Sequence, residues 1–157
     1  MKVEQISLRV LWLEDNEDDV FFMMDALKRS GAPLTLRHVW NGKEALDVLA
    51  SRQEPLPDAI LTDIRMPFMD GLAFTREIRN DPAFESLPVL ILSTSGLSRD
   101  VQVGLDLGAS AYFIKPNSPA GWCTRLNDIY HEILRQIESR RALCNSATDP
   151  VAAEHAS

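Results

Sequence analysis

Polar side chains follow four of the short apolar runs in this chain. They supply three carboxylates, one hydroxyl and one ammonium: Glu14 and Asp15 after the first run, Asp63 after the third, Thr94 behind Ser93 after the fourth, and Lys115 after the fifth. If these runs are parallel strands of one sheet, their carboxyl ends share an edge, and ligands bind at that edge in such sheets. The sequence therefore predicts a single site that combines acidic, hydroxyl and basic groups.

Clustered carboxylates at such a site need a positive counter-charge. Two like charges about 4 Å apart repel by roughly 4 kcal/mol at an effective dielectric constant near 20. Lys115 supplies one positive charge, and a hard divalent cation would supply more. Magnesium prefers a few carboxylates, retained waters and a phosphate oxygen. We therefore expect Mg2+ at a site that binds a phosphoryl group.

Asp63 is the candidate nucleophile, because an aspartate can attack phosphorus to form an aspartyl-phosphate. It follows the run 59–62 and precedes a loop that Pro67 and Gly71 punctuate, which favours a fixed loop shape. In phosphoryl transfer, the protein mainly positions groups and neutralises charge. Lys115 and the metal would neutralise charge, and the Thr94 hydroxyl could donate a hydrogen bond to a phosphate oxygen.

The elements that must position these residues alternate between two kinds of apolar segment. Five short runs are rich in Val, Ile and Leu without strict polar alternation, which suits strands buried on both faces of a parallel sheet. Longer segments with helical spacing lie between them, and the last begins near Ser118 and Pro119. The alternation predicts a three-layer, doubly wound α/β fold. The expected strands are 8–13, 34–39, 59–61, 89–92 and 111–114.

Composition limits the function classes. With 157 residues, of which 45% are hydrophobic and 25% charged, the chain has the make-up of one globular domain. We expect this domain over residues 1–140 and a loose tail over 141–157. Two cysteines and no leader or membrane-length apolar run indicate a cytoplasmic protein with reduced thiols. The net charge of −7 argues against direct nucleic-acid binding.

Several motifs together resemble the response-regulator receiver domain of two-component signalling, over about residues 7–140. They are Glu14-Asp15-Asn16, Asp63 with the loop Met66-Pro67-Phe68-Met69-Asp70-Gly71, Ser93-Thr94, Gly108-Ala109 and Lys115-Pro116. The resemblance is to stand-alone, chemotaxis-regulator-like receivers. It implies a flavodoxin-like five-stranded parallel sheet in the order 2-1-3-4-5.

The same resemblance implies roles for the acidic residues. Asp63 would accept a phosphoryl group from a histidine kinase. Asp15 would bind Mg2+ directly, Glu14 would assist through water, and the backbone carbonyl of Arg65 would be a further ligand. The chain would catalyse its own phosphoryl transfer and dephosphorylation and otherwise would not be an enzyme.

Three further residues take roles from the resemblance. Thr94 and Lys115 would contact the phosphoryl group, and Tyr112 would be a switch aromatic that turns inward when Thr94 moves. Ser93 or Ser95 could replace Thr94 if the register slips, and Tyr112 could be a simple core aromatic. The sequence leaves open whether the Lys115–Pro116 bond is cis.

Partners and rival functions complete the expectations. The output would be protein–protein binding, and Asn16 resembles small regulators that work with phytochrome-type kinases. A homodimer through the last strand and the last two helices competes with an ordinary core helix there. One rival is a receiver-like interaction module without phosphorylation. The other is a haloacid-dehalogenase-type phosphatase, which would need a general acid at Arg65, and a guanidinium cannot serve as one.

Overall fold

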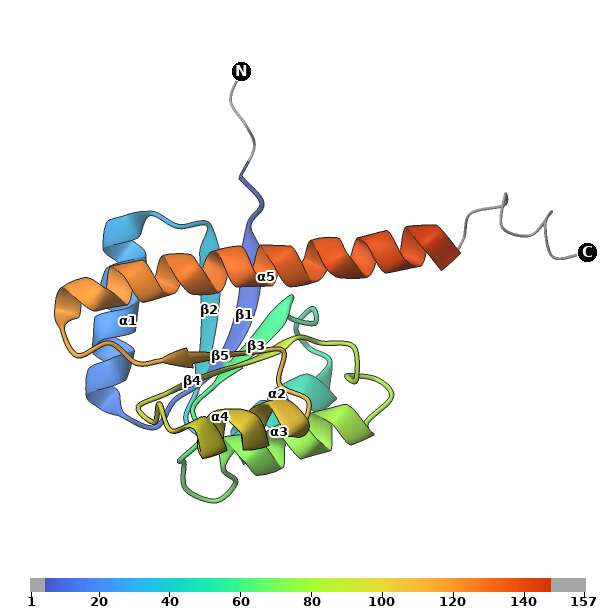
Figure 1. Ribbon diagram of the computed structural model, residues 1–157, viewed down its shortest axis with the longest axis horizontal. Helices are drawn as coiled ribbons and strands as arrows, with labels where there is room; N and C mark the ends of the chain where they lie inside the picture. Colours follow the sequence, from blue (N-terminus) through green and yellow to red (C-terminus); the bar gives the residue numbers. More distant parts are fainter. Residues whose placement is uncertain (1–4, 148–157) are drawn as a thin grey trace, which may run out of the picture.

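The computed structural model describes residues 5–147 as five strands and five helices in strict alternation (Figure 1). The strands are β1 (Leu8–Leu13), β2 (Leu34–Val39), β3 (Ala59–Thr62), β4 (Val89–Ser93) and β5 (Ala111–Ile114). The helices are α1 (Glu17–Ser30), α2 (Gly42–Ser51), α3 (Gly71–Asn80), α4 (Ser98–Asp106) and α5 (Pro119–Ala147). The expected strands are thus confirmed to within one residue at each end.

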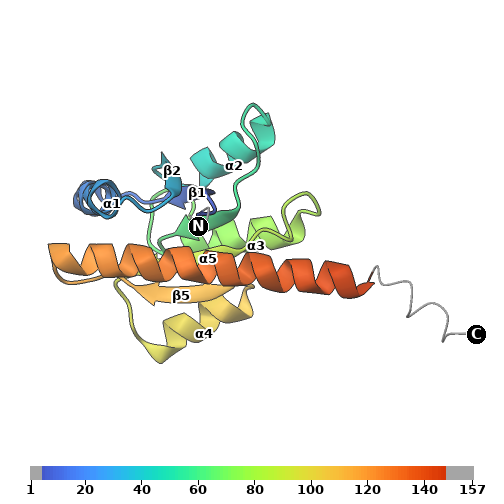
Figure 2. The same ribbon diagram turned by 90° about the horizontal axis from the view of Figure 1, so that it is seen from above.

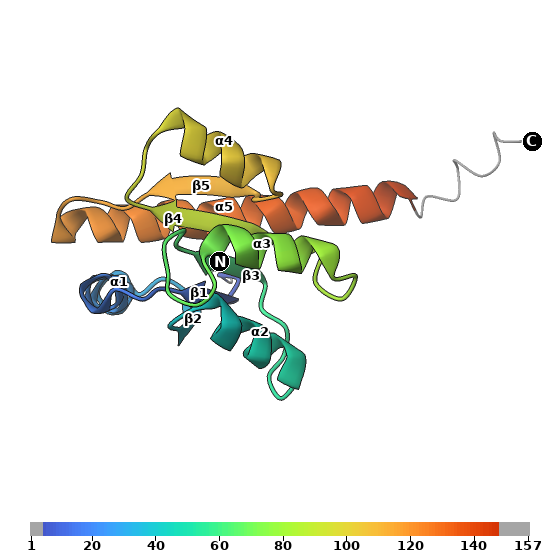
Figure 3. The same cartoon turned by 90° about the horizontal axis from the view of Figure 1, so that it is seen from below.

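The strands form one parallel sheet in the order β2-β1-β3-β4-β5, which confirms the predicted doubly wound topology. One hydrophobic cluster lies between the sheet and the pair α1 and α5, and a second lies between the sheet and the pair α2 and α3. Figures 2 and 3 show α1 and α5 on one side of the sheet, α2 and α3 on the other, and α4 beside β5. All crossovers therefore leave the carboxyl ends of the strands at one edge.

Burial differs between central and edge strands. Every residue of β3 and β4 is buried, and so are all of β1 except Arg9. The edge strands β2 and β5 have mixed burial, with Ile114 exposed. The expectation that all five strands are buried on both faces is therefore wrong for these two. An edge strand has a neighbour on one side only, so a short apolar run does not ensure complete burial.

Helix α1 begins directly after the acidic pair, and its first turn is fixed by a side-chain cap. The Asn16 side chain accepts hydrogen bonds from the backbone amides of Asp18 and Asp19, at 2.9 and 3.1 Å. The helix ends at Gly31, whose φ of 63° is the left-handed conformation that favours glycine. The Asn16 cap sets where Asp19 lies relative to the end of β1.

Helix α5 is longer than the sequence suggested. It continues to Ala147, so the boundary that we drew at residue 140 lies inside a helix, and residues 141–147 are not a loose tail. The apolar repeat ends earlier, but Arg140, Arg141, Ala142 and Leu143 are good helix formers that continue the helix without a core to cover. The rest of the expected tail, 148–157, lies outside the described residues. Within the described part, no helix is long and apolar enough to span a membrane.

Candidate functional site

The carboxyl ends of the four adjacent strands β1, β3, β4 and β5 bring the predicted polar residues to one edge of the sheet. Leu13 pairs with Thr62, and Ser93 pairs with Ile114. The next residues along these strands are therefore Glu14, Asp63, Thr94 and Lys115. Ion pairs join Glu14, Asp63 and Lys115, so the predicted gathering of these three side chains is observed.

The Lys115 ammonium is the centre of the site. Its Nζ donates hydrogen bonds to Asp63 Oδ2 at 2.6 Å and to Asp19 Oδ2 at 2.7 Å. Glu14 Oε1 lies 2.6 Å from Nζ as an ion pair. Sequence reasoning missed Asp19, because it lies in the first turn of α1 and not at a strand end. The sequence offers no signal that separates it from Glu17 and Asp18, the other acids of that turn.

Burial and charge shift the ionisation of this cluster. Burial, together with the nearby charge of Asp63, raises the pKa of Glu14 to about 8. Burial alone would disfavour the Lys115 ammonium, but its contacts with the acids Asp19, Asp63 and Glu14 outweigh that effect and raise the pKa of Lys115. The lysine therefore stays charged at neutral pH, while the raised pKa of Glu14 lets this carboxyl hold a proton there.

Asp63 is held by the backbone around it. Its amide donates to Leu13 O at 3.1 Å, and its Oδ1 accepts from the Ile64 amide at 2.7 Å. Its other carboxylate oxygen, Oδ2, faces Lys115. A Cβ atom at Gly71 would lie 1.9 Å from the Asp63 carbonyl oxygen, so this loop closes against Asp63 only because residue 71 is glycine.

The loop after Asp63 also contains a strained residue. Phe68 has a φ of 68°, and 91% of its surface is exposed. A bulky residue in the left-handed region is uncommon, because its side chain crowds the backbone there. The predicted fixed loop therefore includes a backbone conformation that the sequence, with phenylalanine at this position, gave no reason to expect.

Three carboxylates meet the requirements of a cation site. Oxygens of Glu14, Asp15 and Asp63 lie within 4.8 Å of one another, and Asp15 is exposed at the rim. Within the described residues, Glu14 Oε1 is buried, and the Lys115 ammonium lies 2.6 Å from it outside hydrogen-bonding geometry. An all-oxygen set of this kind suits a hard divalent cation. Arg65, whose backbone carbonyl was the further predicted ligand, lies exposed two residues after Asp63.

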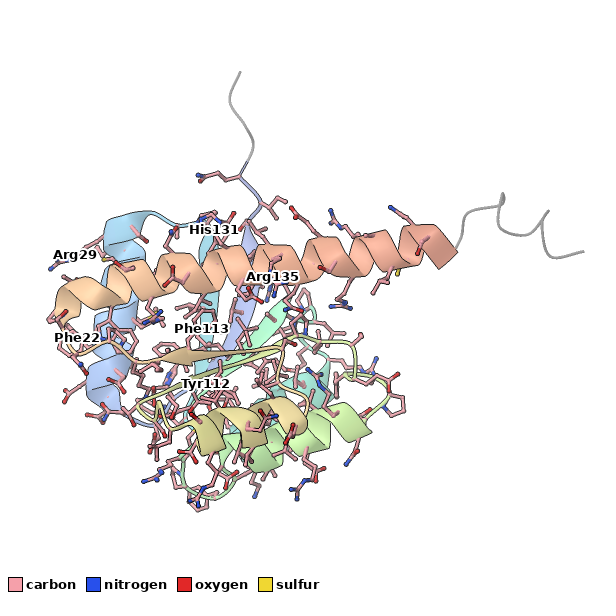
Figure 4. The ribbon with its side chains drawn as sticks, viewed as in Figure 1. Phe22, Arg29, Tyr112, Phe113, His131 and Arg135 are labelled. Atoms are coloured by element: carbon pink, nitrogen blue, oxygen red, sulfur yellow. The ribbon has the colours of Figure 1, made fainter. Side chains whose placement is uncertain are left out.

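The hydroxyl residues lie at the end of β4. Thr94 is exposed, Ser93 is buried, and the Ser95 hydroxyl donates to Asp100 of α4. The Tyr112 hydroxyl donates to the Ser95 carbonyl at 2.7 Å. Its half-buried ring lies beside Gly104 of α4. Figure 4 shows Tyr112 on the side of β5 that faces α4. Tyr112 is thus tied by one hydrogen bond to the segment that carries Thr94.

Two neighbouring features complete the site. Among residues 5–147 every peptide bond is trans, so the Lys115–Pro116 bond, which the sequence left open, is trans. His38 at the end of β2 has its Nε2 2.8 Å from the Glu14 carbonyl oxygen and packs between Trp12 and Trp40. This agrees with a structural role for His38, which supports the backbone at Glu14.

Known proteins are similar to this chain in sequence. The model of the response regulator receiver domain matches residues 10–127. The sensor histidine kinase CheAY of Helicobacter pylori is 36% identical over 109 residues, which cover 69% of this chain and 13% of that protein. The response regulator Rre1 of Synechocystis is 34% identical over 109 residues, 69% of this chain and 46% of that protein. The chain spans less than half the length of these curated relatives.

Two solved structures of response regulators are similar to this chain over most of its fold. The phosphorylated cyanobacterial phytochrome response regulator RcpA matches with a TM-score of 0.74 and 28% identity, covering 82% of this chain and 95% of that one. The Mn2+-bound form of the response regulator Rcp1 matches with a TM-score of 0.69 and 26% identity, covering 78% and 91%. Family match, topology and acidic edge agree, and the chain belongs to the response regulator receiver domain family.

Proposed function

We propose that Asp63 accepts a phosphoryl group from a histidine kinase and that the chain signals through protein–protein binding. The observation that carries this proposal is the Lys115 ammonium 2.6 Å from Asp63 Oδ2 beside two further acids. In the transfer, an Asp63 carboxylate oxygen forms a bond to phosphorus. The bond between phosphorus and the imidazole nitrogen of a phosphohistidine breaks, and its electron pair stays on that nitrogen.

The cation of this site is proposed to be Mg2+, held by Asp15, Asp63, Glu14 and the Arg65 carbonyl. When bound, it neutralises charge on the transferring phosphoryl group. The acidic set within 4.8 Å and the Mn2+-bound relative Rcp1 support a divalent metal. Asp15 is the exposed member of the set, which leaves it accessible to a hydrated ion.

The switch is proposed to run through Thr94 and Tyr112. Thr94 lies exposed after β4 and would turn its hydroxyl toward a phosphoryl oxygen. Tyr112 is bonded to the carbonyl of the next residue, Ser95. A shift of the segment 94–95 would therefore change the position or partner of the Tyr112 hydroxyl, and the surface beside α4 would change with it.

The partners remain proposals as well. The phytochrome-associated relative RcpA supports a phytochrome-type kinase as the phosphodonor. Exposed apolar residues on the α4 and β5 side support a homodimer there: Leu97, Val103, Leu105 and Ile114. Sedimentation with and without a phosphoryl mimic tests the dimer, and a monomer in both states rejects it. The cytoplasmic location stays a prediction.

The experiment that tests the main proposal is phosphorylation by acetyl phosphate with Mg2+, followed by intact-mass measurement. We expect one added phosphoryl group on the wild-type chain and on Asp47→Asn, an exposed control on α2. Asp63→Asn should gain none. A persistent phosphoryl group on Asp63→Asn would overturn the assignment. Turnover of a generic phosphate ester would instead support the rival phosphatase, for which neither the site nor the relatives give support.

A further inference from the structure

Three carboxyl groups surround the Lys115 ammonium, two of them as hydrogen-bond acceptors and Glu14 as an ion pair. An ammonium group has three N–H donors and no acceptor. Here its neighbours are Asp63, Asp19 and Glu14 at 2.6–2.7 Å. A phosphoryl oxygen that arrives on Asp63 needs a donor from the same ammonium. One existing partner must therefore give up its place.

The three partners differ in how easily water can replace the lysine. The side chain of Glu14 is 1% exposed, that of Asp63 11%, and that of Asp19 20%. Water cannot easily replace the lysine beside the buried Glu14, whereas a more exposed carboxylate is rehydrated. Asp63 carries the incoming group and stays beside the lysine. Asp19 is therefore the partner that is released at the lowest free-energy cost.

The place of Asp19 in α1 lowers that cost further. It lies in the first turn of the helix, where the unpaired amides and the helix dipole favour a negative charge. Its own amide is already bonded to the Asn16 side chain, so the turn does not depend on Lys115. The helix end can hold Asp19 in place once the lysine turns away.

We propose that Asp19 is a positioning residue that competes with the phosphoryl group for Lys115 and is exchanged when the phosphoryl group arrives. In the resting protein it holds the ammonium between α1 and β3. The proposal rests on phosphoryl acceptance by Asp63. It adds that the first turn of α1 loses its ion pair with Lys115 when the site is occupied.

The test is titration with beryllofluoride, a phosphoryl mimic, at saturating Mg2+. Asp19→Asn keeps the shape but removes the charge that competes for Lys115, so we expect binding about three- to tenfold tighter than in the wild type. Asp18→Asn is the matched control, because Asp18 is an exposed acid in the same turn. It changes the long-range field equally and should alter affinity less than twofold. Equal affinities for the two variants would overturn the proposal.

A second measurement separates positioning from a merely structural role. In a Lys115→Met background, Asp19→Asn should leave mimic affinity unchanged, because the residue acts only through the lysine. The Lys115 side-chain NMR signal should shift on mimic addition in the wild type and start closer to its bound position in Asp19→Asn. An effect of Asp19→Asn that persists without the lysine contradicts the proposal. Failure of the wild type to bind the mimic would instead contradict phosphoryl acceptance itself.

Discussion

Two cations in this molecule are each held by three oxygens, but the oxygens differ in kind. Lys115, at the carboxyl edge of the sheet, faces three carboxylates. Arg79, at the end of α3, donates to three backbone carbonyls: Gly108 O at 2.8 Å, Leu87 O at 2.8 Å and Glu85 O at 3.0 Å. The carboxylates raise the pKa of Lys115, whereas burial and the charge of Arg140 lower the pKa of Arg79.

The difference separates a site for chemistry from a structural clamp. Carboxylates are charged, so another anion can replace one of them beside Lys115, and a metal ion can replace the ammonium beside the carboxylates. The carbonyls at Arg79 belong to the α3–β4 and α4–β5 connections and are fixed by the chain. Arg79 therefore ties two loops together.

The largest expected effect tests the clamp. Arg79→Ala should lower the free energy of unfolding by about 2–4 kcal/mol, because three carbonyls lose their donor. Urea unfolding measures this loss, and Arg76→Ala, an exposed arginine on the same helix, should change stability little. Added Mg2+ should not rescue Arg79→Ala. A loss of under about 0.5 kcal/mol would show that the clamp is not structural.

Removal of the Lys115 ammonium should lower stability in a way that depends on Mg2+. Lys115→Met should lower stability by about 2 kcal/mol at neutral pH, because the acids of the site lose their counter-charge. Unlike the loss in Arg79→Ala, this loss should shrink in the presence of Mg2+, which offers a replacement charge. Urea unfolding with and without Mg2+ measures it. If Mg2+ restored the stability of Arg79→Ala and Lys115→Met equally, the surroundings of Arg79 and Lys115 would not differ in the way described.

The acidic side of the comparison predicts a pH dependence. The folded pKa of Glu14, about 8, exceeds the ordinary value of 4.5. Its contribution to stability is therefore full below pH 4.5 and is lost as the pH rises through about 8. Metal binding requires the ionised form, so Mg2+ affinity should rise up to tenfold per pH unit up to about pH 8 and then level off.

Calorimetric titration of Mg2+ across this pH range measures the effect. Glu14→Gln cannot ionise and should bind Mg2+ with a flatter pH profile. A wild-type profile that is flat between pH 4.5 and 8 would contradict the raised pKa.

The smallest expected effect concerns the strain beside the site. Phe68→Asn should raise the free energy of unfolding by about 0.5–1 kcal/mol, because asparagine tolerates the left-handed region better than phenylalanine. Phe68→Leu keeps both the bulk and the strain and should leave stability unchanged. Thermal unfolding compares the two variants, and a stabilised Phe68→Leu would show that strain is not the cause.

The sequence predicted the site residues at the strand ends better than the site residue on a helix. Glu14, Asp63 and Lys115 were found because parallel strands end at one edge, a rule that acts on sequence position alone. The direction in which Asp19 points depends on where α1 begins after its Asn16 cap. The sequence alone therefore does not show which of the adjacent acids Glu17 to Asp19 faces the site. Arg79 gave no sequence signal, because its acceptors are backbone atoms.

Three other differences between the sequence predictions and the structure also depend on the surrounding fold. The exposed residues of β2 and β5 depend on which strands lie at the edges, which composition does not state. The end of α5 was placed too early because apolar periodicity reports where a helix is covered and not where it stops. The positive φ of Phe68 could not be predicted from its residue type, because the surrounding loop imposes a conformation that phenylalanine disfavours.

Because helix α5 is long, a small rotation at its base would move its far end by a much larger distance. At 1.5 Å per residue, its 29 residues form a rod about 43 Å long. It begins four residues after Lys115, and its far end projects past the sheet (Figure 1). A tilt of about 5° at its base would carry the tip by about 4 Å. A displacement too small to see beside the acids would therefore be easily measured at the opposite end of the rod.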